Sequence, residues 1–123
     1  MSIVPATFTC PLAEQLAEDV LARFLRYVVV DTMADHASTT YPSRPEQLDL
    51  SRILVAELCE IGLEDVELTE HGYVFASLAG TVPDAPAVGL IAHVDTSPEA
   101  PGAGVRPSVH RSWAGEPIVL SGD

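Results

Sequence analysis

Basic side chains are scarce in this sequence, where six Lys and Arg residues stand against 18 Asp and Glu residues, for a formal net charge of −12 at pH 7. A surface with this charge repels phosphate backbones and anionic lipid headgroups. We therefore expect no nucleic acid and no membrane among the partners of the protein. Solubility is the simplest role of the acidity, and its attraction for a cation is weak and unspecific.

Cysteine is nearly absent as well, with Cys10 and Cys59 as the only two. Two cysteines far apart in a chain of ordinary core composition do not indicate a disulfide scaffold. The first eleven residues have no basic start and no long apolar run, so no secretory leader is expected. No stretch approaches the length of a membrane span. These absences predict a reduced, cytoplasmic protein.

The chain nevertheless has enough apolar material for a core, because 47% of its 123 residues are hydrophobic. This composition and length suit one globular domain and not a disordered segment. Pro11 fits the first turn of a helix over residues 12–29. Apolar residues recur every four positions along that helix and predict a packing stripe, formed by Leu16, Val20, Phe24 and Val28. A second helix is predicted over residues 46–61, with Gly62 as the left-handed residue behind it.

The second half of the sequence predicts strands. Residues 65–69 and 73–79 flank the turn Glu70-His71-Gly72 and indicate a β-hairpin. The continuous apolar run over residues 87–92 is typical of a strand buried on both faces. Two further short strands are predicted over residues 106–111 and 117–120. We therefore expect an α/β fold, with two helices packed on a small mixed sheet that includes a β-hairpin.

Chemistry concentrates where the predicted buried strand ends, at His93-Val94-Asp95. Side chains two positions apart on a strand share a face, so His93 and Asp95 can act as a unit. His93 can bind a metal ion through one ring nitrogen, while Asp95 can fix the ring's tautomer and tilt or touch the metal itself. His-x-Asp also occurs often by chance, and a capped strand end with a satisfied histidine fits the same pattern. His36 and His71 are expected in solvated loops.

A longer motif surrounds this pair, Ile-Ala-His-Val-Asp-Thr-Ser-Pro over residues 91–98. Through it, the chain from about residue 12 onward closely resembles the N-terminal portion of peptidase T, the tripeptide aminopeptidase branch of the zinc-dependent M20 metallopeptidases. The eight-residue motif is specific to this branch, whereas His-x-Asp alone indicates the wider M20 group. Further matches are Arg-Phe-Leu-Arg-Tyr-Val over 23–28, Asp31-Thr32, Pro42-Ser43, Glu57-Leu58, Gly62-Leu63, Gly72-Tyr73, Val82-Pro83 and Trp-Ala-Gly-Glu-Pro-Ile over 113–118.

The resemblance implies that residues 1–123 are the N-terminal part of a zinc-exopeptidase-like catalytic domain, without the rest of that domain and without the inserted dimerisation domain. It implies two zinc ions bridged by an aspartate and a water or hydroxide, a glutamate as general base, and tripeptides as substrates. His93 matches the first zinc ligand, and Asp95 matches the catalytic-site aspartate that orients this ligand. Zinc in such a site lowers the pKa of its bound water and polarises the scissile carbonyl. The resemblance also leaves room for a homodimer of the full-length form.

The other ligands of the family site match nothing in these 123 residues. One histidine and one carboxylate do not complete a tetrahedral zinc site, so we expect no catalysis from the chain alone. Two alternatives stay open. The chain could come from another M20 branch, a carboxypeptidase or deacylase, although the extended motif after Asp95 argues against this. It could also be a truncated, non-catalytic α/β module that folds or associates without chemistry.

Overall fold

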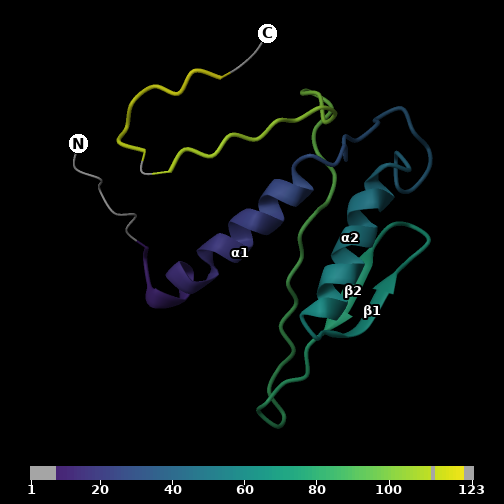
Figure 1. Cartoon of the computed structure of the whole chain (residues 1–123). Helices are drawn as coiled ribbons and strands as arrows, with labels where there is room; N and C mark the ends of the chain where they lie inside the picture. Colours follow the sequence, from purple (N-terminus) through teal and green to yellow (C-terminus); the bar gives the residue numbers. More distant parts are fainter. Residues whose placement is uncertain (1–7, 112, 121–123) are drawn as a thin grey trace.

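The computed structural model describes residues 8–111 and 113–120. Along the chain it contains α1 (Pro11–Tyr27), α2 (Gln47–Glu60), β1 (Glu64–Leu68) and β2 (Val74–Ser77), as Figure 1 shows. These elements confirm the predicted small α/β fold with two helices and a β-hairpin. Among the described residues, neither helix combines the length and the apolar character that crossing a membrane requires.

The first helix, α1, begins at the predicted proline. Pro11 occupies the first turn, where its missing N–H would have no helical partner. Glu14 in the first turn and Arg26 in the last turn complement the helix dipole. The backbone N–H of Val28 donates to the carbonyl of Phe24 at 2.9 Å and closes the last turn. The helix therefore ends two residues before the predicted boundary.

The second helix, α2, packs on both strands of the hairpin. Leu50 is its buried apolar residue, with 8% of its surface exposed. The hydroxyl of Ser51 lies 3.3 Å from the carbonyl oxygens of Gln47 and of Gly72 in the hairpin turn, so it can donate to either. Gly62 follows the helix at a φ of 84°, the left-handed conformation that the sequence predicted there. Four of the five buried residues in the described chain lie on α2.

The hairpin is antiparallel, with Leu68 paired to Val74 and Glu67 paired to Phe75. A register shift between Glu64 and Glu67 marks a bulge in β1. The sheet thus has two strands, and the expected parallel component is reduced to a single bridge between Met33 and Thr96. This bridge connects the loop after α1 to the segment that carries His93 and Asp95.

Three predicted strands are wrong. Residues 87–92, 106–111 and 117–120 form no strand in the described chain. The apolar run over residues 87–92 lies in the solvent, with Leu90 94% and Ile91 99% exposed. Figure 1 shows it as a plain trace outside the hairpin. A strand buried on both faces needs strands beside it and layers above and below it, and the two strands of the hairpin pair with each other instead.

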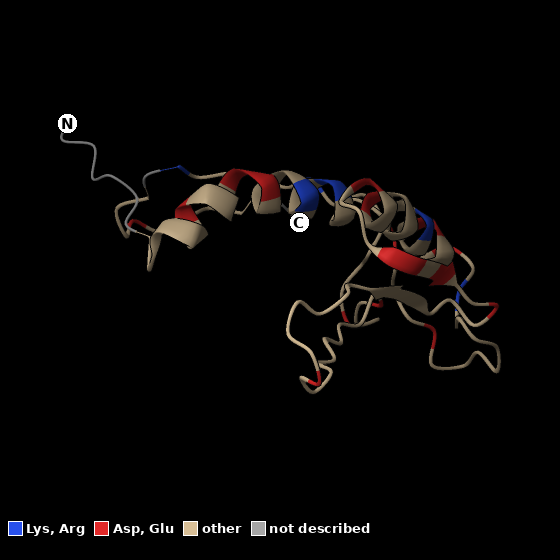
Figure 2. Ribbon diagram, turned by 90° about the horizontal axis from the view of Figure 1, so that it is seen from below, with Lys and Arg blue, Asp and Glu red and all other residues tan. Residues whose placement is uncertain are grey.

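The prediction that the apolar stripe of α1 packs into a core is also wrong. Leu16, Val20 and Phe24 are all exposed, and α1 has no buried residue. Polar side chains attach this helix to α2 instead. Acidic residues are spread over both helices and several loops (Figure 2), which agrees with a general solubilising role for the net charge.

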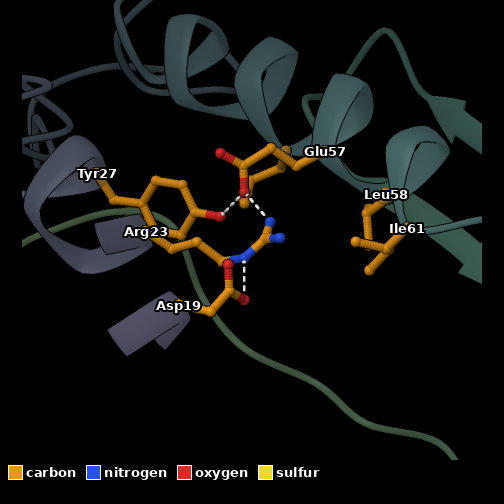
Figure 3. A pocket seen from close by; sticks show the side chains of 7 residues that line it. Asp19, Arg23, Tyr27, Glu57, Leu58 and Ile61 are labelled. Carbon is orange, nitrogen blue, oxygen red and sulfur yellow. Dashed lines mark hydrogen bonds and ion pairs between the residues drawn. The ribbon is translucent and has the colours of Figure 1, made fainter. Parts of the chain in front are cut away.

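Glu57 of α2 is the centre of this attachment, and its side chain is only 11% exposed. One carboxylate oxygen accepts hydrogen bonds from Arg23 and from the hydroxyl of Tyr27. The other accepts from Arg26, with Nη2 at 2.7 Å and Nε at 3.1 Å. Asp19 accepts from Nε of Arg23 at 2.8 Å and so orients that guanidinium group. Figure 3 shows Arg23 and Tyr27 converging on Glu57 from α1.

These contacts change the proton affinity of the groups involved. The hydrogen bond from Tyr27, followed by those from Arg26 and Arg23, holds the pKa of Glu57 below its usual range, although burial opposes this effect. Burial and the neighbouring Glu57 raise the pKa of Tyr27. An ionised carboxylate is therefore the form of Glu57 that stabilises the contact between the helices.

The first prediction concerns the pH dependence of stability. Because the pKa of Glu57 is lowered on folding, its contribution is complete above the unfolded carboxyl pKa of about 4.3 and is lost as the pH falls through the folded value. Glu57→Gln should lower the free energy of unfolding at pH 7 by about 1–3 kcal/mol. It should also flatten the loss of stability in acid, as measured by urea denaturation between pH 7 and pH 3.

Glu64→Gln is the matched control, because Glu64 is an exposed carboxylate for which the described residues provide no ion pair. This variant should keep the acid slope of the unaltered chain. An equally steep acid slope in Glu57→Gln and in the unaltered chain would contradict the role of Glu57.

The second prediction compares two aliphatic residues. Leu50→Ala should lower the free energy of unfolding by about 2–4 kcal/mol, since it leaves a cavity where the buried apolar side chain of α2 lies. Ile91→Ala should change it by less than about 0.5 kcal/mol, because this side chain lies in the solvent. Thermal and urea unfolding of both variants measure the difference. A loss at Ile91 as large as the loss at Leu50 would mean that the segment over residues 87–92 is covered.

Candidate metal-ligand site

The structure brings His93 and Asp95 together. Nδ1 of His93 lies 2.8 Å from the backbone carbonyl oxygen of Asp95 and 3.2 Å from its carboxylate Oδ1. The sequence predicted this pairing from the pleat of a strand, and the pair forms here in a segment that joins no strand. The carbonyl oxygen is the nearer partner, and sequence reasoning did not foresee it.

This contact determines which nitrogen of the ring is available. A carbonyl oxygen can only accept, so Nδ1 of His93 carries the proton in this hydrogen bond. In the neutral imidazole, Nε2 then keeps its lone pair. The side chain of His93 is 84% exposed, so this nitrogen is accessible from the solvent. The arrangement fits a metal ligand that binds through Nε2 and is oriented through Nδ1.

The backbone after Asp95 is anchored by Thr96. The N–H of Thr96 donates to the carbonyl of Thr32 at 3.1 Å, and the carbonyl of Thr96 accepts from the N–H of Ala34 at 2.9 Å. Met33 and Thr96 therefore form an isolated parallel bridge. Thr32 is buried. The loop after α1 thus holds the segment that carries His93 in place. The sequence had predicted that a buried strand over residues 87–92 would do this.

Sequence reasoning missed this loop as part of the site. Gln47, at the start of α2, donates from its amide nitrogen to the carbonyls of Thr32 and Met33, each at 3.3 Å. Asp31 accepts from the N–H of Met33 at 3.1 Å and from Arg44 at 3.2 Å. One signal was present in the sequence, because Asp31-Thr32 is among the motifs of the family resemblance.

His36 and His71 lie where the sequence placed them, in exposed loops. His71 is exposed in the hairpin turn. His36 is exposed beside Asp35, on the wall of an open hollow that Pro98 also lines. A second hollow lies between α1 and α2 (Figure 3). The charged groups on its wall already pair with one another around Glu57. This second hollow therefore belongs to the contact between the two helices.

A metal centre needs more ligands than these residues offer. Across residues 8–111 and 113–120, no three His, Cys, Asp or Glu side chains converge on a point where they could hold a metal ion. Tetrahedral zinc takes three or four protein ligands. The described part of the chain therefore fits one ligand, His93, with Asp95 as its support, and does not fit a complete site.

Comparison with known proteins shows which proteins this chain is similar to. No protein-family model matches the chain. Individual curated proteins do match it. It is 43% identical over 109 residues to Peptidase T of Listeria monocytogenes serotype 4a (strain HCC23), an alignment that covers 88% of this chain and 27% of the relative.

Two further relatives agree. Peptidase T of Geobacillus thermodenitrificans (strain NG80-2) is 45% identical over 107 residues, covering 86% of this chain and 26% of the relative. Peptidase T of Bacillus mycoides (strain KBAB4) is 40% identical over the same length and with the same coverage. The chain thus spans about a quarter of the length of these relatives, a share consistent with the expected N-terminal portion. Over most of its length the chain is therefore similar to one part of these peptidase T proteins.

Proposed function

We propose that this chain is the N-terminal part of a catalytic domain that hydrolyses peptides and that, when completed, releases the N-terminal residue of tripeptides with the help of zinc. The observation that carries the proposal is the His93–Asp95 contact, in a chain that is 40–45% identical to peptidase T proteins. The peptide substrate and the zinc are inferred from the family resemblance. The orientation of the His93 ring is compatible with a zinc ligand.

The two residues have different roles in this proposal. His93 is one zinc ligand and binds through Nε2. Asp95 is a positioning residue that accepts a hydrogen bond from Nδ1–H and so makes Nε2 a stronger metal ligand. Bound zinc would supply Lewis acidity toward the scissile carbonyl and a more acidic water. The remaining ligands and the general base come from the part of the family that the chain does not span.

The state of the two cysteines supports a reducing compartment such as the cytoplasm. Cys10 and Cys59 are both free and exposed. Exposed free thiols persist where the surroundings keep them reduced. The localisation therefore forms part of the proposal.

A second candidate is a non-catalytic α/β module formed by these residues alone. The observation in its favour is that the described residues bring no three metal-ligating side chains together. This candidate and the first one differ in what happens when the rest of the family sequence is supplied. Under the first, activity appears. Under the second, it does not.

The third prediction tests this with a chimera, in which this chain replaces the matched 109 residues of the Listeria relative. The chimera should release the N-terminal residue from a tripeptide with a free amino group, and a chelator should abolish the release. His93→Ala should lower kcat/KM by more than about 100-fold, and Asp95→Ala by about 10–100-fold. The 123-residue chain alone should show no activity.

His71→Ala is the matched control, because it removes an exposed imidazole of the hairpin turn and should leave kcat/KM unchanged. An active chimera that keeps its rate with His93→Ala would refute the ligand assignment. Hydrolysis of N-blocked substrates in preference to free tripeptides would indicate a carboxypeptidase or deacylase.

A further inference from the structure

Gln47 occupies an unusual place for a polar side chain, buried at the first position of α2. Its amide nitrogen lies 3.3 Å from the carbonyl oxygen of Thr32, 3.3 Å from that of Met33 and 3.1 Å from the hydroxyl of Ser43. An amide nitrogen has two protons to donate, so these acceptors satisfy it completely. A buried donor with this many partners fixes the loop around it.

The carbonyl of Thr32 links Gln47 to the candidate site. It accepts from Gln47 on one side and from the backbone N–H of Thr96 at 3.1 Å on the other. Met33, the second acceptor of Gln47, forms the parallel bridge with Thr96. Thr96 directly follows Asp95. One carbonyl group therefore separates the side chain of Gln47 from the segment that carries the His93–Asp95 pair.

Asp31 secures the same loop from the other side. Its Oδ1 accepts from the N–H of Met33 at 3.1 Å, and its Oδ2 accepts from Arg44 at 3.2 Å. The chain beyond Thr96 returns to this carboxylate, because a Cβ added to Gly102 would lie 2.4 Å from Oδ1 of Asp31. A side chain at position 102 would collide there. Residues 96 and 102 thus both rest on residues 31–33.

The segment on the other side of His93 offers no comparable support. Val88, Leu90 and Ile91 are almost fully exposed, and residues 87–92 join no strand in the described chain. Their contacts therefore do not hold the imidazole in place. Apart from its own contact with Asp95, the position of His93 depends on Thr96 and on the loop that binds Thr96.

We propose that Gln47 and Asp31 are positioning residues for the His93–Asp95 pair. Gln47 acts through the carbonyls of Thr32 and Met33, and Asp31 acts through the N–H of Met33 and the close approach of Gly102. The chain of hydrogen bonds from Gln47 to Thr96 is observed directly in the structure. Its role in catalysis rests on the proposed function. If a side chain served only the stability of α2, its substitution would speed hydrogen exchange to the same extent throughout the fold.

The fourth prediction uses amide hydrogen exchange of the 123-residue chain, followed by NMR. Gln47→Met removes both donors at similar size and without added charge. It should speed exchange at the amides of Thr96 and Ala34 by at least about 10-fold, because a loss of about 1.4 kcal/mol in local opening free energy corresponds to that factor. The hairpin amides of Thr69 and Tyr73 should keep their rates.

Gln15→Met is the matched control, since Gln15 is exposed on α1 and should leave every one of these rates unchanged. Gly102→Ala provides an independent arm, because its methyl group meets Asp31 and should speed exchange at Met33 and Thr96. Equal acceleration at the hairpin and at Thr96 would overturn the proposal in favour of a purely structural role. Unchanged exchange at Thr96 in both Gln47→Met and Gly102→Ala would overturn it as well.

A second readout in the chimera separates this proposal from the proposed function. In an active chimera that His93→Ala inactivates, Gln47→Met should lower kcat by about 10–100-fold at a nearly unchanged KM. An unchanged kcat would refute the positioning role while the peptidase function stands. An inactive chimera in which Gln47→Met still speeds exchange at Thr96 would refute the peptidase function and leave the positioning of His93 intact.

Discussion

Buried polar groups must be satisfied, and three of them on α2 determine how the rest of this chain is arranged. Gln47 binds the loop after α1, Ser51 contacts the hairpin turn, and Glu57 binds α1. Every buried side-chain nitrogen or oxygen of the described residues has a partner. An unpaired buried donor or acceptor costs about 1–3 kcal/mol, so each contact fixes one neighbouring element in a single place. Leu50, between Gln47 and Ser51 along α2, is the buried apolar residue of this helix.

The apolar residues show the opposite distribution. The stripe of α1 and the run over residues 87–92 are exposed, although a stand-alone domain would bury such side chains. The chain matches about a quarter of the length of its peptidase T relatives. Exposed apolar surface together with satisfied polar contacts agrees with the proposal that the chain is part of a larger catalytic domain, because polar contacts can form locally while a layered core needs all of its layers.

Local patterns predicted the local features of this fold. The helices, the glycine after α2 and the hairpin turn follow from periodicity and turn chemistry over a few residues. The exposure of residues 87–92 was not predicted, because an apolar run does not show whether other parts of the protein cover it. The meeting of His93 and Asp95 was predicted from their spacing of two positions, although the segment that carries them belongs to no strand. The link from Gln47 to Thr96 spans almost fifty positions and leaves no spacing pattern in the sequence.

The most direct test of the central claim, that His93 is a metal ligand held in place through Asp95 and Thr96, is a crystal structure of the chimera grown with zinc and measured at the zinc absorption edge. The account predicts an anomalous peak about 2.0–2.1 Å from Nε2 of His93, with Nδ1 still facing Asp95 and Thr96 still bonded to Thr32. Zinc bound by other residues of the chimera, with His93 outside its coordination sphere, would contradict the account.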